Sequence, residues 1–134
     1  MTTPPGFGTV FPYLFVSEAA AYISFLTLAL KAEEVGRTLR PDGKVANAQI
    51  RIGDTSFMVS EASDAYPPSR CALYLYVENA DGAMEHALKH GAAHEMDVAD
   101  MPYGDRQGGV RDPAGNVWWI SQRLVEDPHY PTTD

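Results

Sequence analysis

Three histidines in the second half of the chain stand at intervals of four residues: His86, His90 and His94. On a helix, His86 and His90 would lie one turn apart, and their imidazole nitrogens could hold a metal ion. The stretch lacks the glutamate of a His-Glu-x-x-His motif, which acts as a general base. The end of a helix is also a favourable place for a cationic histidine. The spacing therefore favours a solvated helix end over a metal site, and His129 is expected to be solvated in the tail.

Glu61 is the one acid that we expect in apolar surroundings, at the end of a strand over residues 56–61. Such surroundings would raise the pKa of its carboxyl group and suit it to act as a general base. A carboxylate at a strand end can equally be solvated. Glu61 is the single catalytic candidate.

Two further features could do chemistry. Asp105 and Arg106 are adjacent in a glycine-rich stretch, where we expect a loop ion pair that could act as a lid over a ligand. Cys71 begins an expected strand without a histidine nearby, so we expect a buried thiol rather than a nucleophile.

The elements that must position these residues repeat along the chain. Val16 and Val77 each end an expected strand before a helix, 61 positions apart (77 − 16). Gly53 and Gly115 each precede a last strand, 62 positions apart (115 − 53). Ser17 is the expected N-cap of the first helix. Each half reads strand, helix, strand, strand, strand, with strands expected at 9–16, 33–40, 45–52, 56–61, 71–77, 94–99 and 117–123, helices at 18–30 and 81–90, and a loop at 101–109 entering a strand that ends near 112.

This order predicts an α+β fold in one domain, residues 1–134. Two βαβββ half-domains, at about 7–62 and 70–124, form a curved mixed sheet around a cleft, and a loose tail follows over 125–134. One helix covers one face of each four-stranded sheet, and the other face is left for a ligand, the second half or a second subunit.

Composition narrows the class of protein. Hydrophobic residues make up 45% of the chain, which is typical of a globular fold. The net charge of −8 repels phosphate backbones and argues against nucleic-acid binding. No apolar run approaches the roughly 18–20 residues that span a bilayer, and the N-terminus does not read as a signal peptide. Cys71, as a single cysteine, fits a reducing compartment, so we expect a cytoplasmic protein without membrane contact.

Several segments carry a family resemblance: residues 12–16, 47–54, 103–106 and 111–118, the last containing the Asp-Pro-x-Gly-Asn turn. The chain resembles the vicinal oxygen chelate superfamily, which includes glyoxalase I, extradiol dioxygenases and bleomycin-resistance proteins, and within it the PhnB-like or bleomycin-resistance-like branch. The resemblance implies the duplicated fold and a homodimer. It also implies, for the enzymes, a divalent metal held by His or Glu on the first and last strands of each half.

The metal positions that this resemblance implies carry no suitable donor. They fall on Phe11, a residue near Phe57, Ala72 and Trp119. Positions that often carry His and Glu in the PhnB-like branch are the neutral Asn47 and Gln49. We therefore predict no metal and no cofactor.

Strand alternation assigns a mostly aromatic face to the cleft. Such a face suits a planar ligand held by stacking and a few hydrogen bonds, although the same rings could fill the space between the sheets or cover a dimer interface. The predicted ligand-binding residues are Phe11, Tyr13, Phe15, Asn47, Gln49, Arg51, Phe57, Val59, Tyr74, Tyr76, Arg106, Trp119, Ser121 and Arg123.

Three functional hypotheses follow. The first is a metal-free protein that binds and sequesters a small aromatic or amphipathic compound such as an antibiotic. The alternative is a metal-dependent lyase, isomerase or dioxygenase of the same superfamily. A third is a metal-free enzyme that uses Glu61 and an arginine.

Overall fold

The computed structural model describes residues 2–130, which divide into two compact units with the boundary between Arg70 and Cys71. Each unit is one half of the duplicated pattern and is described by itself. The four C-terminal residues of the predicted tail lie outside the described residues. None of the helices described in either unit is long and apolar enough to cross a membrane.

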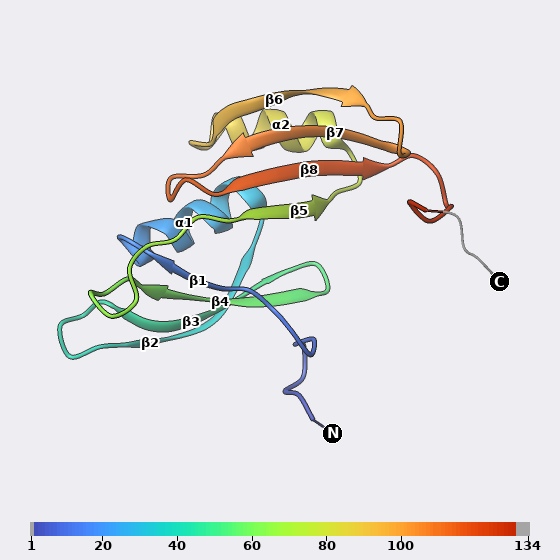
Figure 1. The fold of residues 1–134 in the computed structure, drawn as a ribbon. Helices are drawn as coiled ribbons and strands as arrows, with labels where there is room; N and C mark the ends of the chain where they lie inside the picture. Colours follow the sequence, from blue (N-terminus) through green and yellow to red (C-terminus); the bar gives the residue numbers. More distant parts are fainter. Residues whose placement is uncertain (1, 131–134) are drawn as a thin grey trace. The chain divides into compact units, whose positions relative to one another are not determined.

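The first half contains one helix and one mixed sheet (Figure 1). Its sheet has the strand order β1-β4-β3-β2, with β1 parallel to β4 and the other pairs antiparallel. The helix packs on one sheet face through its buried apolar side chains. The elements are β1 (Tyr13–Val16), α1 (Ala19–Leu30), β2 (Glu33–Leu39), β3 (Val45–Ile52) and β4 (Thr55–Glu61).

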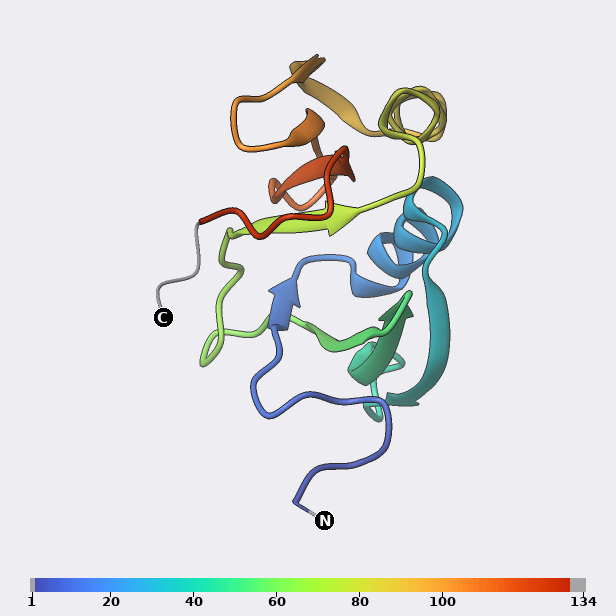
Figure 2. The same cartoon turned by 90° about the vertical axis from the view of Figure 1, so that its right-hand side faces the viewer.

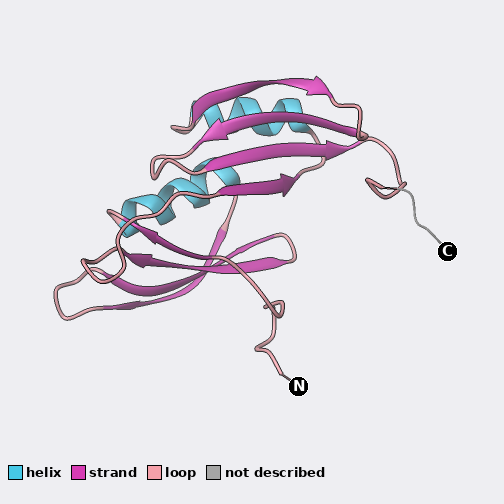
Figure 3. Ribbon diagram, in the orientation of Figure 1, coloured by secondary structure: helices cyan, strands magenta, loops and turns pink. Residues whose placement is uncertain are grey.

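The second half repeats this arrangement with the order β5-β8-β7-β6, again with its first and last strands parallel. Its helix lies along one face of its sheet, as the rotated view in Figure 2 also shows. The βαβββ order predicted for each half is confirmed (Figure 3). The elements are β5 (Ala72–Tyr76), α2 (Ala80–Lys89), β6 (Ala93–Asp100), β7 (Asp105–Arg111) and β8 (Val117–Arg123).

The first helix begins differently from the prediction. The sequence predicts Ser17 as N-cap, but the N-cap is Glu18, which has a φ of 56° and makes no side-chain capping bond. The backbone N–H groups at the start of the helix instead donate to Glu61 at the end of β4. Its two carboxylate oxygens accept from the N–H groups of Glu18 (2.9 Å) and Ala19 (3.0 Å). A carboxylate at a helix N-terminus is also favoured by the helix dipole. Glu61 therefore caps α1.

The predicted face of β4 is wrong, and the correction affects three predicted site residues: Phe57, Val59 and Glu61. In the parallel pairing Val59 lies beside Leu14, which is buried on the helix side, and Val59 is inaccessible to solvent. Met58, which the predicted alternation leaves for the helix side, instead points to the other face, where its sulfur accepts from Asn47. The run Phe57-Met58-Val59 is apolar throughout, so alternation could not orient this strand.

The stretch predicted as a loop over 101–109 is a strand from residue 105 onward. Its glycines permit close packing on both faces of β7. A Cβ atom added at Gly109 would lie 2.7 Å from the ring of Trp119, and one added at Gly108 would lie 3.0 Å from the sulfur of Met84 on α2. An alanine at Gly109 would require the indole to move, and one at Gly108 would also lie 2.8 Å from Val98 on β6, so the glycines let Trp119 and α2 approach β7 closely.

The Asp-Pro-x-Gly-Asn turn ties β7, β8 and β5 together. The Asp112 carboxylate accepts from the N–H groups of Ala114 (2.9 Å) and Asn116 (3.0 Å) and from the indole N–H of Trp118 (2.8 Å). The Asn116 side chain in turn accepts from the N–H of Cys71 at 2.9 Å. The motif thus stabilises the turn and the start of β5, which explains its value for recognising the fold.

Candidate functional site

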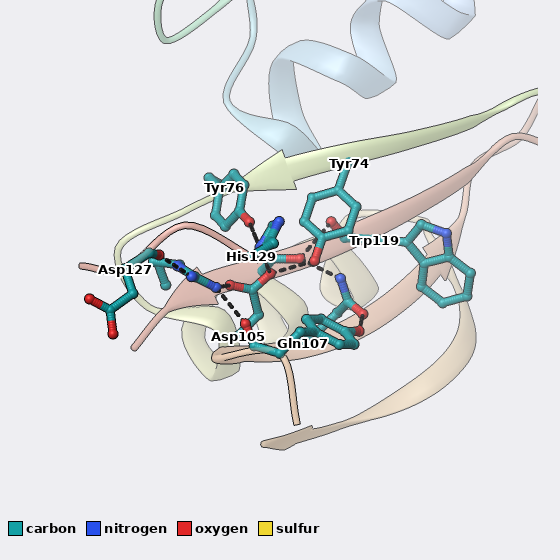
Figure 4. Close-up of polar contacts among 10 residues, drawn as sticks. Tyr74, Tyr76, Asp105, Gln107, Trp119, Asp127 and His129 are labelled. Carbon is teal, nitrogen blue, oxygen red and sulfur yellow. Dashed lines mark hydrogen bonds and ion pairs between the residues drawn. The ribbon is translucent and has the colours of Figure 1, made fainter. Parts of the chain in front are cut away.

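A fully buried carboxylate, Asp105, lies on the sheet face of the second half that is turned away from α2, where several polar side chains converge on it (Figure 4). It is the first residue of β7 and pairs with Arg123, the last residue of β8. A guanidinium nitrogen of Arg123 lies 2.9 Å from Asp105 Oδ1. The ion pair compensates a charge that burial would otherwise make very costly. The predicted loop pair of Asp105 with Arg106 is therefore wrong.

The other carboxylate oxygen of Asp105 accepts three more hydrogen bonds. The hydroxyls of Tyr74 and Tyr76 donate to Oδ2, the latter at 2.9 Å, and Nε2 of His129 lies 3.2 Å away. The same His129 nitrogen lies 2.8 Å from the Tyr76 hydroxyl. Since Tyr76 gives its single proton to Asp105, His129 must carry hydrogen on Nε2 and act as the donor.

These contacts move the pKa values in opposite directions. Burial would raise the pKa of Asp105, but the hydrogen bonds from Tyr74, Arg123, Tyr76 and His129 outweigh it and lower this pKa overall. Burial and then the bond to Asp105 raise the pKa of both tyrosines above their usual value. The carboxylate is therefore ionised and the phenols are neutral donors at neutral pH.

Neutral polar side chains continue the network along the sheet. Gln107, one residue beyond Arg106 on β7, donates to the hydroxyl of Ser121 at 2.7 Å. The Tyr103 hydroxyl donates to the Gln107 carbonyl, and the Tyr103 backbone carbonyl accepts from Arg123 at 2.7 Å. All of these groups are partnered, so the floor of the site is rigid and pre-organised.

Aromatic rings stand above this polar floor. Tyr74 and Tyr76 are each 46% exposed, and their ring centroids are 5.3 Å apart. Trp119 pairs with both Tyr74 on β5 and Gly109 on β7, so its indole lies against the glycine backbone. Figure 4 shows both tyrosines and Trp119 around Asp105 and Gln107.

An open depression adjoins the tyrosines. It has a volume of about 330 Å³, which falls in the lower range of small-molecule sites. One wall is the segment after β8, where Arg123 also donates to the backbone carbonyl of Asp127. The residues lining it are Tyr76, Arg123, Asp127, Pro128 and His129.

The first half carries a related but uncharged cluster. The Tyr13 hydroxyl lies 2.6 Å from the Ser60 hydroxyl, and the Asn47 amide donates to Tyr13 at 3.2 Å. Tyr13 and Tyr74 are 61 positions apart (74 − 13), as are Ser60 and Ser121 (121 − 60). The duplication therefore extends to a tyrosine and a serine at matching places.

The charged pair is specific to the second half. Sixty positions before Asp105 stands Val45, and 61 before Arg123 stands Ala62. The first half instead has three stacked aromatic rings. The ring centroids of Tyr13 and Phe15 are 4.9 Å apart, and those of Phe15 and Tyr66 are 5.2 Å apart.

Other predicted ligand-binding residues have different partners. Arg51 pairs with Glu33 at 2.7 Å on the first sheet. Arg106 pairs with Asp81 (2.7 Å) at the start of α2 and with Asp100 (2.9 Å) on β6, so it anchors that helix.

Two further predicted ligand-binding residues lie in the first half. The ring of Phe11 lies 4.6 Å from that of Phe7, and Gln49 pairs with Met58 in the sheet.

Two of the three evenly spaced histidines are neighbours, and the third has a different partner. The rings of His86 and His90 are 4.4 Å apart, whereas His94 pairs with Asp97 at 2.7 Å. Cys71, predicted to be buried, is exposed.

Within residues 2–130, no group of three or more His, Cys, Asp or Glu side chains is placed to hold a metal ion. The positions implied for a metal in the enzymes are Phe11, a residue near Phe57, Ala72 and Trp119, and the side chains of the four residues named offer no oxygen, sulfur or imidazole donor. The residues present do not fit that metal.

Sequence reasoning missed the residues at the centre of the second-half site. His129 was expected to be solvated, but it contacts Tyr76 and Asp105. The sequence predicts a loop for Asp105 and Gln107, because glycines surround them. The available signal was the alternation of Tyr74 and Tyr76, which puts two hydroxyls on one face and calls for a shared acceptor.

Comparison with known proteins gives a consistent set of relatives. The model of the Glyoxalase/Bleomycin resistance protein/Dioxygenase superfamily matches residues 7–120. The uncharacterized protein Mb0911c of Mycobacterium bovis is 32% identical over 126 residues, covering 86% of this chain and 83% of that protein. The uncharacterized protein Rv0887c of Mycobacterium tuberculosis is also 32% identical, covering 86% of this chain and 74% of that protein.

Solved structures agree with the fold. TnmS3, an antibiotic binding protein from Streptomyces sp. CB03234, has a TM-score of 0.71 at 21% identity, covering 92% of this chain and 98% of that chain. TioX from Micromonospora sp. ML1 has a TM-score of 0.71 at 20% identity, covering 90% of this chain and 100% of that chain. At these identities the likeness concerns the fold alone.

Proposed function

Since this chain belongs to the Glyoxalase/Bleomycin resistance protein/Dioxygenase superfamily, we propose that it binds and sequesters a small aromatic or amphipathic compound, such as an antibiotic, without a metal. The observation that carries the proposal is the arrangement around Asp105. Two half-exposed tyrosines are held by a fully buried carboxylate, with an open depression beside them. The fold is also that of TnmS3, an antibiotic binding protein.

The physical basis is a rigid surface of rings over a satisfied polar floor. Tyr74 and Tyr76 cannot rotate freely, because their hydroxyls are bonded to Asp105. Ligand stacking on these rings therefore costs little side-chain conformational entropy. Each aromatic contact contributes about 0.5–1.5 kcal/mol beyond the buried area, and a few of them can support micromolar affinity. Phe57, Val59 and Glu61 are not part of the proposed site, because they lie on the helix side of the first sheet.

The enzymatic alternatives lack a comparable arrangement. Glu61, the candidate general base, uses its two carboxylate oxygens to cap α1. The positions implied for a metal carry apolar side chains. About one equivalent of zinc, nickel, manganese or iron in protein purified without chelator would contradict the metal-free proposal.

Binding can be tested by quenching of tryptophan fluorescence, since Trp119 adjoins the proposed site. We expect at least one compound in a panel of aromatic and glycopeptide antibiotics to bind with micromolar affinity. Replacing Tyr74 and Tyr76 together by alanine should weaken this binding by ~10-fold or more, given the stacking energy of two rings. Tyr66→Ala, which removes an exposed tyrosine ring of the first half, is the matched control. The absence of binding by every compound in a broad panel of such antibiotics would contradict the proposal.

Two further properties belong to the proposal. A homodimer is expected from the resemblance to the PhnB-like or bleomycin-resistance-like branch, and light scattering after size-exclusion chromatography would measure it. A cytoplasmic location fits the single cysteine.

A further inference from the structure

The side chain of His129 occupies the second-half site in the way that a ligand would. Its imidazole lies among three tyrosine rings, with centroid distances of 6.5 Å to Tyr74, 6.4 Å to Tyr76 and 6.0 Å to Tyr103. It stacks on Tyr76 and meets the other two rings edge-on. Its Nε2–H reaches both the Tyr76 hydroxyl and the Asp105 carboxylate.

We infer that this subsite, formed by Tyr74, Tyr76, Tyr103 and Asp105, recognises a planar nitrogen heterocycle with an N–H donor, and that the chain's own His129 fills it until such a ligand arrives. The inference rests on the proposed function, because it names the ligand class of the same site. It also gives the segment after β8 the role of an internal competitor for the ligand.

The polarity of the subsite selects a donor over an acceptor. Asp105 presents a carboxylate oxygen, and Tyr76 presents a lone pair because its proton is used on Asp105. The neighbouring cation Arg123 already donates to Asp105, to the Tyr103 carbonyl and to the Asp127 carbonyl. A ligand N–H would therefore find two acceptors, whereas a ligand carboxylate would be repelled by the negative charge of Asp105.

The faces of the subsite favour an electron-poor ring. Tyrosine faces carry negative partial charge and attract the positive edge of a heterocycle or a cationic ring. The separation of about 6 Å between imidazole and tyrosine centroids lies within the range of favourable aromatic pairs. The subsite therefore fits a flat ring of the size of imidazole or slightly larger.

The His129 segment is suited to being displaced. Five residues, 124–128, connect β8 to His129, and Leu124 and Val125 are each nearly half exposed. A short tether of this kind gives an effective concentration in the millimolar range, which is enough to fill a weak site without locking it. Segments with few buried apolar contacts open at low free-energy cost.

The test compares the full-length protein with its His129→Ala variant, using benzimidazole as the probe and tryptophan quenching or calorimetry as the readout. Removing the internal competitor should tighten benzimidazole binding by about tenfold, because the free site is then fully populated. His94→Ala is the matched control, since His94 is an exposed histidine paired with Asp97 elsewhere in the same half. Circular dichroism should show the wild-type fold for both variants.

Two additional measurements make the result specific. Tyr76→Phe in the His129→Ala background removes one acceptor and should reduce the gain in affinity. Benzoate, a ring with a carboxylate in place of the N–H, should bind at least tenfold more weakly than benzimidazole. Unchanged affinity after His129→Ala, equal binding of benzoate, or no benzimidazole binding by any variant would overturn the inference.

The outcome is distinguishable from that of the proposed function. If antibiotics bind through Tyr74 and Tyr76 while His129→Ala has no effect on benzimidazole, only the inference fails. If the tyrosine replacements leave antibiotic binding unchanged, the proposed site fails, whatever His129 does.

Discussion

Oδ1 of Asp105 lies 2.9 Å from a guanidinium nitrogen of Arg123, and the carboxylate is inaccessible to solvent. This pair joins the first residue of β7 to the last residue of β8. The two tyrosine hydroxyls of β5 bond to the same carboxylate, so one side chain links three of the four strands of the sheet. The aromatic surface of the proposed site depends on this link.

Replacing Asp105 by alanine should destabilise the protein by about 3 kcal/mol, because it leaves the partly buried Arg123 charge and two phenol hydroxyls without their acceptor. Urea denaturation measures the change. Asp97→Ala is the control and should have little effect, because Asp97 is exposed and its ion pair with His94 is at the surface. Equal stability of the two variants would show that the network around Asp105 contributes nothing to folding.

The stability contributed by Asp105 should depend on pH. The pKa of its carboxyl is lower in the folded protein than in the unfolded chain, so the folded state favours the ionised form. The stabilisation is therefore complete above the ordinary pKa of an aspartate and is lost as the pH falls through the folded-state value. The difference in unfolding free energy between wild type and Asp105→Ala should shrink from about pH 7 to about pH 3. A difference that stays constant over this range would contradict the assignment of an ionised carboxylate.

The pattern of correct and incorrect predictions follows from what local sequence can encode. The bounds of β3 and β8 are those predicted, because polar and apolar residues alternate in β3 and aromatic residues open β8. The predicted orientation of β4 is wrong because the centre of this strand is apolar at three consecutive positions, so alternation does not show which side faces the helix. The first part of β7, residues 105–109, is predicted as a loop because glycines are typical of turns, whereas Gly108 and Gly109 make room for α2 and for Trp119.

The candidate site was harder to predict than the fold, since its contacts join distant residues. Asp105 lies 31 positions from Tyr74 and 24 from His129 in the chain. No local motif marks these three residues as a group, and the segment carrying His129 has the composition of a loose tail. The tyrosines of β5 were placed on the correct face by alternation, but their shared acceptor became visible only in the sheet pairing.

Gly109→Ala should destabilise the protein by about 1–3 kcal/mol and move Trp119, because an added Cβ would lie 2.7 Å from the indole. Near-ultraviolet circular dichroism and the tryptophan emission maximum report the displacement. Gly36→Ala on β2 is the matched control, since nothing lies within 4 Å of its added Cβ. If both alanine variants behave alike, close packing of the indole on β7 is not what requires glycine at this position.

Glu61→Ala should cost about 1–2 kcal/mol of stability, because the first amides of α1 lose their acceptor. Glu61→Gln should cost less, since an amide oxygen can accept one of the two hydrogen bonds. The second half already uses this solution: Gln122, 61 positions later (122 − 61), accepts from the first amide of α2, that of Ala80, at 3.0 Å. Thermal denaturation would rank the two variants, and ligand binding in the second half should be unchanged in both. Loss of a chemical activity in Glu61→Gln with stability intact would instead restore Glu61 as a general base.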